Sequence, residues 1–586
     1  MTKQLPGVDI VLVGFGWTGA IYAEKLTAAG LNVLALERGP WRDTPNDFAT
    51  TFAQDELRYY WRHGMFQEAS QATLTFRNNS SQTALPMRHW GSFLPGNGVG
   101  GSGVHWNGQT YRFLPSDFLA RTHNEERYGP LPEHVTVQDY GVTYDELEPH
   151  FDYFEKICGI CGQAGNLNGE TVEGGNPFEG PRSDNYPNPP MQMTFSQDRF
   201  AAAARELGLS PFPVPSANMS RAYVNPLGLQ LAPCTYCGFC EKHGCGNYSK
   251  SSPQTTIIHV LMQRPNFALR TNSEVLSIEK APDGSMASGV TYIDANGDSF
   301  FQPAEVVVLC AYPLENTRLL LLSQIGEPYD PQSGEGVVGK NYCYQVMSSA
   351  TVFYDEEFTN GFVGAGALGM VIDDYNGDNF DHSGLGFIGG GYIACHTTNA
   401  RPIESHPVPD NVPSWGSRWK KAVRENFLKT TSVGVHGASM AHRSNYLDLD
   451  PTYTDAHGRP LLRMTYDFTL NDRRLTQHLT PVAEQIANGM GGREVKVNIR
   501  RGSYDSVPYQ TTHNTGGTIM GADPKSSVVN RYCQSWDLPN LFVAGAGLFP
   551  QNAGYNPTGT VGALAYWSVD AIINQYLRQP GPLVQP

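Results

Sequence analysis

The first forty residues carry the pattern that most restricts the fold of this chain. Gly14, Gly16 and Gly19 form a G-x-G-x-x-G turn between an apolar run and a stretch with helical composition. The first glycine of such a turn permits the tight bend, the second lets a pyrophosphate approach the backbone, and the third allows close helix packing. Glu37, at the end of the next apolar run, can accept ribose hydroxyls. The expected strand, helix and strand cover residues 8–13, 20–29 and 31–37.

This unit predicts an α/β domain that binds a dinucleotide, and an ordinary glycine turn is the alternative. Other segments have the alternation of paired strands or the composition of helices that return to the same domain. The expected strands are residues 268–278, 289–293, 305–311 and 541–546, and the expected helices end at Ser323 or begin near Asn556.

A second glycine-rich segment runs from Pro95 to Asn107 and reads PGNGVGGSGVHWN. Its composition is too flexible for a helix or a strand, so we expect a loop whose backbone passes close to a flat ring such as a flavin. His105 then falls where a ring carbon can be attacked, although a buried histidine beside Trp106 explains it equally well. The candidate contacts are Gly98, Gly100, Gly101, Ser102, His105 and Asn107.

The length and charge of the chain limit its organisation and its partners. We expect 586 residues to form two interleaved lobes, and a net charge of -15 without a long basic run argues against a nucleic-acid partner. No apolar stretch is long enough to span a membrane, and the N-terminus lacks the basic region and cleavage site of a signal peptide. The predicted cofactor lobe comprises residues 1–140, 220–345 and 495–586, and an α+β substrate lobe comprises residues 141–219 and 346–494.

Polar residues near the C-terminus suggest oxidation of a hydroxyl group. Such a reaction needs a base near the hydroxyl and a partner that orients the oxygen. We assign His513 as the base and Asn556 as the orienting partner. Asn514 is a second candidate for hydrogen bonding, with a simple turn role as its alternative.

Four cysteines lie within twelve residues, at Cys234, Cys237, Cys240 and Cys245. Soft sulfur ligands at this spacing favour an iron–sulfur cluster. A structural zinc site and disulfides remain open as alternatives. A separate pair, Cys158 and Cys161, suggests either a local disulfide or two free thiols.

Together these motifs resemble the glucose-methanol-choline (GMC) oxidoreductases. The resemblance rests on the N-terminal glycine turn with Glu37, the loop from Gly98 to Ser102, the segment 311–323, His513 with the glycines that follow it, and Asn556-Pro557. It implies a Rossmann-like FAD-binding domain interleaved with a substrate-binding domain. It also implies further FAD contacts at Arg38, Val275, Ala546, Asn556 and Thr558.

Within the family the chain resembles the flavoprotein subunits of membrane-bound sugar and sugar-acid dehydrogenases of the gluconate type. The resemblance implies hydride transfer from a sugar, polyol or sugar acid to FAD, which in some relatives is linked covalently to the histidine that matches His105. It further implies a [3Fe-4S] cluster on the cysteines and a multihaem cytochrome c partner that passes electrons to quinone. A small subunit carrying the export signal would place the complex on the periplasmic face of the cytoplasmic membrane.

Two other functions compete with this interpretation. One is an oxygen-using sugar oxidase of the same fold with structural zinc at the cysteines, and the other is a non-catalytic flavin electron-transfer module. A basic residue in the substrate lobe would favour an acidic substrate, and Arg401, Arg418, Lys420 and Lys421 lie there, but the sequence assigns none of them.

Overall fold

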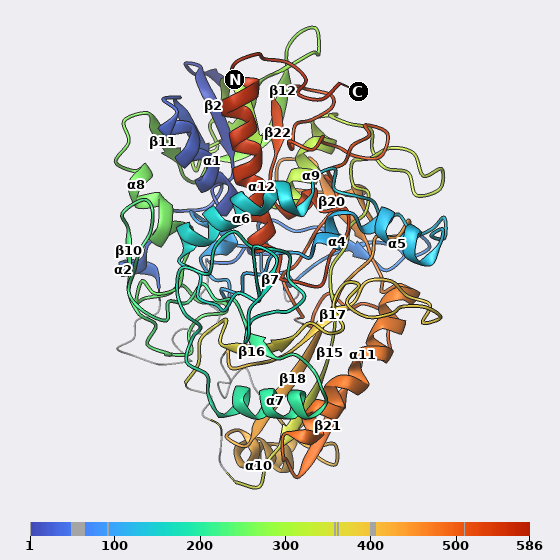
Figure 1. The fold of residues 1–586 in the computed structure, drawn as a ribbon. Coiled ribbons are helices and arrows are strands. Elements are labelled where there is room, and N and C mark those ends of the chain that lie inside the picture. Colours follow the sequence, from blue (N-terminus) through green and yellow to red (C-terminus); the bar gives the residue numbers. More distant parts are fainter. Residues whose placement is uncertain are drawn as a thin grey trace.

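The computed structural model describes residues 2–48, 65–90, 93–356, 359, 363–398, 406–508 and 510–585. Figure 1 shows two lobes, with both chain termini at the end that carries β2, α1 and α12. At the opposite end lies an antiparallel sheet with helices against it. The expected α/β architecture of the chain is confirmed by these sheets of mixed orientation.

The first lobe is built on an eight-stranded sheet whose central strands are parallel. The path order is β11-β3-β2-β14-β13-β12, and β1 and β22 both pair with β14. The strands are β1 (Lys3–Gln4), β2 (Val8–Val13), β3 (Val33–Leu36), β11 (Phe267–Arg270), β12 (Glu274–Lys280), β13 (Ala287–Ile293), β14 (Ser299–Leu309) and β22 (Leu541–Val543). Because β2 pairs with both β3 and β14, its C-terminal end lies in the middle of the parallel region.

The turn after β2 has the geometry that its glycines predict. Gly14 has φ +92°, and a Cβ atom there would lie 2.7 Å from the carbonyl oxygen of Cys310. Helix α1 (Trp17–Ala28) begins three residues before the expected start, so Gly19 lies inside its first turn. A Cβ atom on Gly19 would lie 2.5 Å from the carbonyl oxygen of Gly14, which is the close packing that the third glycine allows.

Helices pack against the first sheet and against one another. Helix α12 (Thr558–Ala571) contacts both α1 and α6 (Tyr144–Cys158), and α9 (Pro313–Leu322) contacts β12. Helix α6 therefore packs on the first lobe, although its residues fall in the range that the sequence analysis gave to the substrate lobe. It begins with a capping box between Thr143 and Glu146, which satisfies free backbone N–H groups.

The second lobe contains a six-stranded antiparallel sheet in the order β21-β15-β18-β17-β16-β8. The strands are β8 (Phe212–Pro213), β15 (Val346–Phe353), β16 (Gly369–Ile372), β17 (Gly391–His396), β18 (Thr430–Gly437) and β21 (Glu494–Asn498). Helices α7 (Phe195–Glu206) and α11 (Leu470–Gly489) pack against this sheet. The predicted lobe boundary between residues 494 and 495 falls inside β21.

Smaller elements complete the described fold. A four-stranded sheet in the order β19-β20-β4-β5 joins strands distant in sequence, and two further strand pairs are β6-β7 and β9-β10. These elements are β4 (Thr75–Arg77), β5 (Leu85–Pro86), β6 (Asn166–Leu167), β7 (Glu170–Thr171), β9 (Tyr223–Val224), β10 (Gln230–Leu231), β19 (Tyr446–Thr454), β20 (Pro460–Thr465), α2 (Thr44–Asp47), α4 (Pro115–Phe118), α5 (Ala120–Tyr128), α8 (His259–Leu261) and α10 (Gly416–Asn426).

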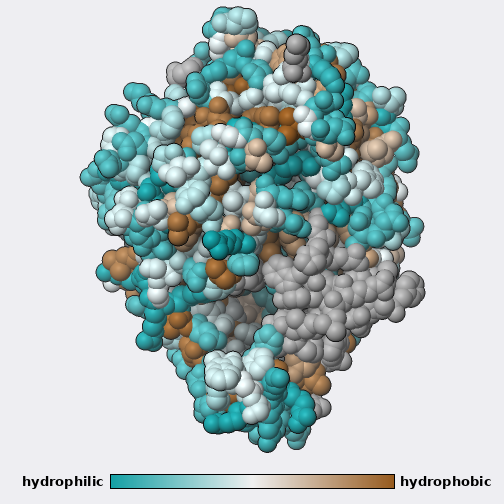
Figure 2. Space-filling model, turned by 180° about the vertical axis from the view of Figure 1, so that it is seen from behind, coloured by the Kyte–Doolittle hydropathy of each residue, from teal (hydrophilic) through white to brown (hydrophobic). Residues whose placement is uncertain are grey.

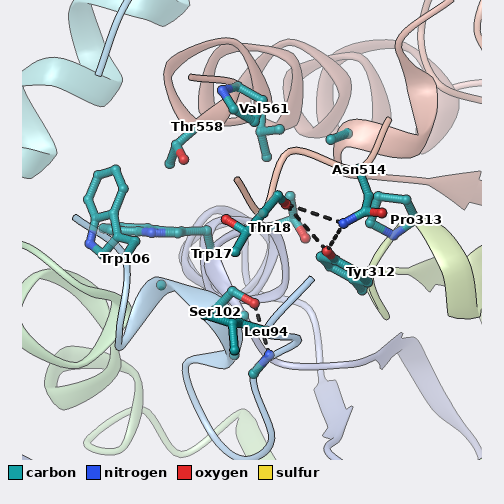
Figure 3. Close-up of a pocket in the computed structure, with 18 of the residues that line it drawn as sticks. Trp17, Thr18, Leu94, Ser102, Trp106, Tyr312, Pro313, Asn514, Thr558 and Val561 are labelled. Carbon is teal, nitrogen blue, oxygen red and sulfur yellow. Dashed lines mark hydrogen bonds between the residues drawn. The ribbon is translucent and has the colours of Figure 1, made fainter. Parts of the chain in front are cut away.

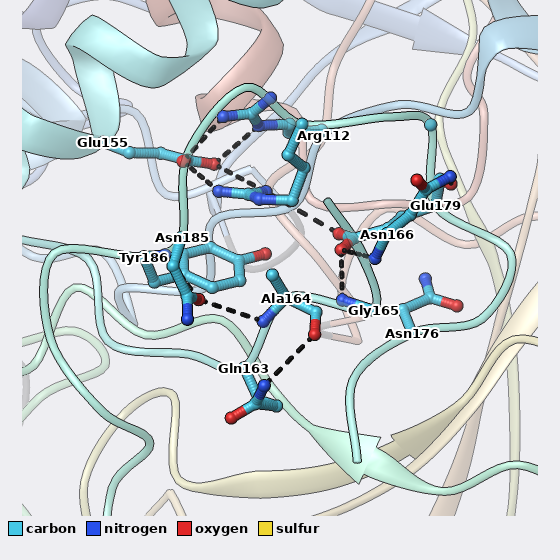
Figure 4. A network of polar contacts seen from close by, with 12 residues as sticks. Arg112, Glu155, Gln163, Ala164, Gly165, Asn166, Asn176, Glu179, Asn185 and Tyr186 are labelled. Atoms are coloured by element: carbon cyan, nitrogen blue, oxygen red, sulfur yellow. Dashed lines mark hydrogen bonds and ion pairs between the residues drawn. The ribbon is translucent and has the colours of Figure 1, made fainter. Parts of the chain in front are cut away.

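A buried ionic network joins α6 to two loops (Figure 4). Glu155 on α6 accepts hydrogen bonds from Nε and Nη2 of Arg112, each at 2.9 Å, and a further one from Arg182. The Arg182 side chain is fully buried and stacks on the ring of Tyr186, 3.9 Å from the ring centre. Because two guanidinium groups share one carboxylate, removal of that carboxylate would leave both charges buried without this partner.

Along the ranges that the structure describes, no helix is long and apolar enough to cross a membrane. On the face shown in Figure 2, hydrophobic residues gather in separate patches among hydrophilic ones.

Candidate active site

A cavity of about 430 Å³ connects the glycine turn of the first lobe with the sheet of the second lobe. Figure 3 shows part of its wall, where Thr558 and Val561 project from α12 and Trp106 lies across from Tyr312 and Asn514. Its volume lies within the usual range for ligand and cofactor pockets. The predicted residues that line it are Gly14, Gly16, Glu37, Arg38, Gly101, Ser102, His105, Asn107, Val275, His513, Asn514, Ala546, Asn556 and Thr558.

One end of the cavity has the features of a dinucleotide site. Glu37 directly follows β3 and accepts hydrogen bonds from the backbone N–H groups of Phe15, at 2.9 Å, and Gly39, at 2.8 Å. These bonds fix the carboxylate beside the glycine turn. Gly16 and Gly101 line the wall with bare backbone, and the N-terminus of α1 adjoins them. This end therefore suits the phosphates and ribose of FAD.

Three predicted contacts do not reach the wall. Gly19 packs against the carbonyl oxygen of Gly14, as described above. Gly98 and Gly100 have φ +114° and +92° and shape the second glycine loop behind the wall. Within the described residues these three glycines support the cavity rather than line it.

At the other end, His513 and Asn556 lie side by side. Nδ2 of Asn556 is 3.2 Å from Nε2 of His513, and Nδ1 of His513 is 2.6 Å from Oε1 of Gln345. The amide nitrogen of Gln345 donates to the carbonyl oxygen of Gly554, so its oxygen faces His513. Nδ1 of His513 must then carry the proton, which leaves a lone pair on Nε2.

The orientation of Asn556 is fixed in the same way. Its Oδ1 accepts a hydrogen bond from the hydroxyl of Tyr392 at 3.0 Å, so its Nδ2 faces His513. Burial lowers the pKa of His513 to about 3, so the ring is neutral at physiological pH. The Nε2 lone pair accepts from Asn556 in this structure, and once a substrate hydroxyl lies between the two side chains the neutral ring can accept its proton while the amide holds the oxygen.

Asn514 is held by two tyrosines. Its Nδ2 donates to the hydroxyl of Tyr312 at 2.7 Å, and its Oδ1 accepts from the hydroxyl of Tyr342. Both the Asn514 and Tyr312 side chains lie in the cavity wall (Figure 3). The structure thus gives Asn514 a supporting role in the wall, because both its amide nitrogen and its amide oxygen already have partners.

His105 is 4% exposed and packs edge-to-face against the ring of Phe66, with 4.6 Å between ring centres. Burial, followed by the charge of Lys250, lowers the pKa of His105 to about 3. Its Nε2 atom has no hydrogen-bond partner within the part of the chain that the structure describes. A neutral, unpaired nitrogen in the cavity wall is compatible with a flavin link and with a core histidine, so both interpretations stay open.

The cysteine loop lies directly behind His105. Glu241 and Lys242, between Cys240 and Cys245, line the cavity, and the N–H of Lys242 donates to the carbonyl oxygen of His105 at 2.9 Å. The buried Lys250 donates to the carbonyl oxygens of Trp106, Cys240 and His243 at 2.7 to 2.8 Å. Lys250 thus holds the cysteine loop against the second glycine loop.

Among the described residues no cysteine forms a disulfide, so Cys158 and Cys161 are not joined. Burial, together with the charge of the neighbouring thiols, raises the pKa of Cys234 and of Cys237. Cys234 packs against the apolar cluster that contains Cys240. Within the described ranges, however, no three His, Cys, Asp or Glu side chains converge on a point that could hold a metal ion.

Four residues of the second lobe that lie beside the catalytic pair or line the cavity were not predicted from the sequence. His396 and His436 line the cavity, whereas Gln345 and Tyr392 contact His513 and Asn556. Tyr392, His396 and His436 project from one face of β17 and β18. Tyr392 and His396 occupy alternate positions of an otherwise apolar strand, which is the only sequence signal that points to them. The basic candidates Arg418, Lys420 and Lys421 lie exposed on α10, away from the cavity wall, and Arg401 lies outside the described residues.

Comparison with known proteins agrees with this geometry. Models of the GMC oxidoreductase family match residues 189–347 and 441–565. The gluconate 2-dehydrogenase flavoprotein of Pantoea cypripedii is 47% identical over 100% of this chain and 96% of its own length. The chain belongs to the GMC oxidoreductase family. It is therefore an FAD-dependent oxidoreductase that acts on CH–OH groups.

More distant GMC oxidoreductases also align over nearly the whole chain. The large subunit of fructose dehydrogenase from Gluconobacter japonicus is 25% identical over 98% of this chain and 99% of its own. Pyridoxine 4-oxidase from Mesorbium loti has a TM-score of 0.61 at 17% identity and covers 98% of this chain and 100% of its own, which shows the shared fold.

Proposed function

We propose that this chain is an FAD-dependent dehydrogenase that oxidises a hydroxyl group of a sugar acid, with gluconate as the favoured substrate. The observation that carries the proposal is the hydrogen-bonded pair His513 and Asn556 in a cavity that begins at the glycine turn. The similarity to a gluconate 2-dehydrogenase flavoprotein over both full lengths supports the choice of substrate. FAD bound along the cavity would supply the hydride acceptor.

The chain's own groups supply the proton chemistry. Nε2 of His513 takes the proton of the substrate hydroxyl, and Nδ2 of Asn556 donates to the same oxygen. Gln345 accepts from Nδ1 and so holds the imidazole in the reactive tautomer. As the carbon loses a hydride, the hydroxyl becomes a carbonyl group, and the proton on His513 leaves to solvent.

A test of this proposal compares substrates and variants with the FAD-loaded protein. Anaerobic mixing with gluconate should bleach the flavin absorbance and yield a keto acid. His513→Ala should retain bound FAD but lose about 10²- to 10⁴-fold in kcat, because that is the usual contribution of a positioned base. Wild-type protein that holds FAD but reduces it with no sugar acid, sugar or polyol would refute the proposal and favour an electron-transfer module.

We also propose that Cys234, Cys237, Cys240 and Cys245 bind an iron–sulfur cluster of the [3Fe-4S] type. Their spacing and their soft sulfur ligands support it. The placed side chains do not yet form a closed site within the described chain, so cluster binding requires the loop to rearrange. We therefore derive no catalytic step from the cluster.

Metal analysis decides between the alternatives for the cysteines. Iron and acid-labile sulfide in the 3:4 ratio of a [3Fe-4S] cluster, and an electron paramagnetic resonance signal from the oxidised protein, would support the cluster. Cys237→Ser should then lose iron, whereas Cys395→Ser, which removes a thiol from β17, should retain it. Zinc without iron, together with hydrogen peroxide formed during turnover in air, would instead support the sugar oxidase.

We propose, from the resemblance to membrane-bound dehydrogenases, that this subunit acts on the periplasmic face of the cytoplasmic membrane. It would do so with a small subunit that carries an export signal and with a multihaem cytochrome c subunit. Co-expression with such subunits, followed by gluconate-dependent reduction of haem in the purified complex, tests it. Haem that stays oxidised while the flavin is reduced would contradict the proposed electron path.

A further inference from the structure

Two histidines of the second lobe face the catalytic pair. His396 ends β17, and His436 lies on β18 directly opposite Tyr392 in the antiparallel register. The rings of His436 and Tyr392 stack with 4.5 Å between centres and 10° between planes, and the two histidine rings are 6.0 Å apart. Tyr392 in turn donates to Asn556. The two histidine rings line the cavity, and Tyr392 connects His436 with the catalytic pair.

Neither histidine is used by the chemistry described so far. Nε2 of His396 and Nδ1 of His436 are buried without a hydrogen-bond partner among the described residues. Burial lowers the pKa of His396 to about 4 and holds that of His436 well below its ordinary value, with neighbouring His396 and His513 adding to the effect on His436. Unpaired nitrogens in a polar wall are costly unless a ligand pairs with them, so these two rings are suited to hold a polar substrate group.

The chemistry of a sugar acid limits where its carboxylate can lie. In gluconate, the carboxylate is attached to the carbon that bears the 2-hydroxyl group. When that hydroxyl meets His513 and Asn556, the carboxylate must contact the wall within one or two bonds of them. Among the cationic side chains in the wall, Arg38 lies at the dinucleotide end, 3.5 Å from Glu315, and Lys242 lies on the cysteine loop.

We propose that His396 and His436 form the subsite that binds the carboxylate of the substrate and so select sugar acids over neutral polyols. The inference rests on the proposed sugar-acid function and adds the residues that bind the carboxylate. A neutral imidazole still donates one N–H hydrogen bond, and two such donors can bind both carboxylate oxygens. Met347, which pairs with His436 across β15 and β18, supplies apolar wall beside them.

The test compares d-gluconate with d-gluconamide, which replaces the carboxylate by a neutral amide and keeps every hydroxyl group. His396→Phe and His436→Phe keep a ring but remove the donors. Each should raise KM for gluconate at least tenfold, with kcat changed less than threefold. The ratio of kcat/KM for gluconate to that for gluconamide should fall at least tenfold, and His396→Gln should recover part of it.

Two further variants separate this role from general damage. Tyr392→Phe removes the hydroxyl that holds Asn556, so it should lower kcat for both substrates and leave their ratio unchanged. His89→Gln, at an exposed position, should change neither kcat nor the ratio between the two substrates. Binding of 2-deoxygluconate, which lacks the reacting hydroxyl, should weaken in the two Phe variants when measured by competitive inhibition.

Other results would overturn the assignment. If both Phe variants lower kcat/KM for gluconate and for gluconamide equally, the two histidines do not bind the carboxylate. If Lys242→Met alone abolishes the preference for gluconate, the acid is bound by that lysine instead. Failure of the proposed function has a different signature, because wild-type protein would then oxidise neither gluconate nor gluconamide.

Discussion

At the scale of single residues, the chemistry depends on how amide side chains orient an imidazole. Gln345 is held by Gly554 and presents its oxygen to His513, while Asn556 is held by Tyr392 and presents its nitrogen. Each amide has one partner that fixes its rotation and one that faces the site. Because Nδ1 must donate, the lone pair of His513 lies on Nε2, where it faces Nδ2 of Asn556.

We predict that Gln345→Ala lowers kcat by about tenfold to 100-fold, because the imidazole loses the acceptor that fixes its tautomer. Gln345→Glu keeps an acceptor and should retain more activity than Gln345→Ala. Steady-state kinetics on FAD-loaded protein measure both. Gln534→Ala, at a buried amide outside the cavity wall, is the matched control and should leave kcat unchanged. Equal activity of all three variants would remove Gln345 from the site.

We predict that kcat/KM for a neutral polyol changes less than twofold between pH 7 and pH 5. Burial lowers the pKa of His513 to about 3, so protonation removes the base only as the pH approaches that value. A histidine with an ordinary pKa of about 6.5 would lose roughly 30-fold over the same interval. An acid limb centred near pH 6.5 in the pH profile would contradict the burial of this ring.

At the scale of secondary structure, two features position the site: the turn between β2 and α1, and the ionic network on α6. The turn restricts the backbone conformation, and the network pairs charges that are buried. The turn brings bare backbone to the cavity, and the network anchors α6, which packs on α12. Helix α12 begins at Thr558, two residues after Asn556, so its placement also sets the position of the catalytic amide.

We predict that Gly14→Ala destabilises the protein and prevents FAD retention, whereas Gly30→Ala has a small effect. Both glycines have positive φ, +92° and +91°, so both variants are strained by about 1–2 kcal/mol. At Gly14 the new Cβ would lie 2.7 Å from a backbone oxygen, whereas a Cβ on Gly30 would have no described atom within 4 Å apart from its chain neighbours. Flavin absorbance and melting temperature measure the difference. Equal losses in the two variants would show that φ alone matters.

We predict that Glu155→Gln lowers the free energy of unfolding by about 3–5 kcal/mol, because two buried guanidinium groups lose their shared carboxylate. Urea denaturation followed by tryptophan fluorescence measures it. Asp298→Asn breaks the exposed pair with Lys3 and should not move the midpoint. A Glu155→Gln midpoint equal to that of the wild type would mean that solvent reaches this network.

At the scale of the whole molecule, buried ionisable groups of opposite type set the pH range of stability. Burial raises the pKa of Asp373 to about 7 and that of Asp472 to about 6, and both side chains are fully buried. Burial lowers the pKa of His105 to about 3. The aspartates bind protons more tightly in the folded state than in the unfolded state, and the histidine binds them less tightly.

We predict that the melting temperature is highest near pH 6.5. The stability from the aspartates is complete below their unfolded pKa of about 3.9 and is lost progressively up to about pH 6 for Asp472 and about pH 7 for Asp373. The contribution of His105 is complete above about 6.5 and is lost as the pH falls below it, and burial lowers the pKa of His513 to about 3 and that of His396 to about 4 with the same effect. Each group contributes about 1.4 kcal/mol per pH unit in its window, so the three histidines outweigh the two aspartates below pH 6.5 and only the loss at Asp373 remains above it. Asp373→Asn should therefore flatten the fall in melting temperature above the maximum, and thermal melts from pH 4 to pH 9 test this.

Several elements could be predicted from the sequence because their signals are local. Residues 8–13 form β2 as expected, and the helix after them begins only three residues early, since Trp17 and Thr18 do not reveal where a helix starts. His513 and Asn556 were also predicted, and the structure brings them within 3.2 Å. The lobe boundaries stay predictions, because strand pairing of β21 and packing of α6 cross them.

The sequence alone establishes the glycine turn and the parallel α/β domain, and it points to the polar pair His513 and Asn556 that we propose as the catalytic residues. These follow from backbone conformation and periodicity, which act over a few residues. The tertiary structure was needed for the tautomer of His513, for the contacts of Gln345 and Tyr392, and for the placement of His396 and His436 beside the proposed catalytic pair. Those contacts join residues more than 40 positions apart, and their energies depend on burial and on strand register, which no local pattern encodes.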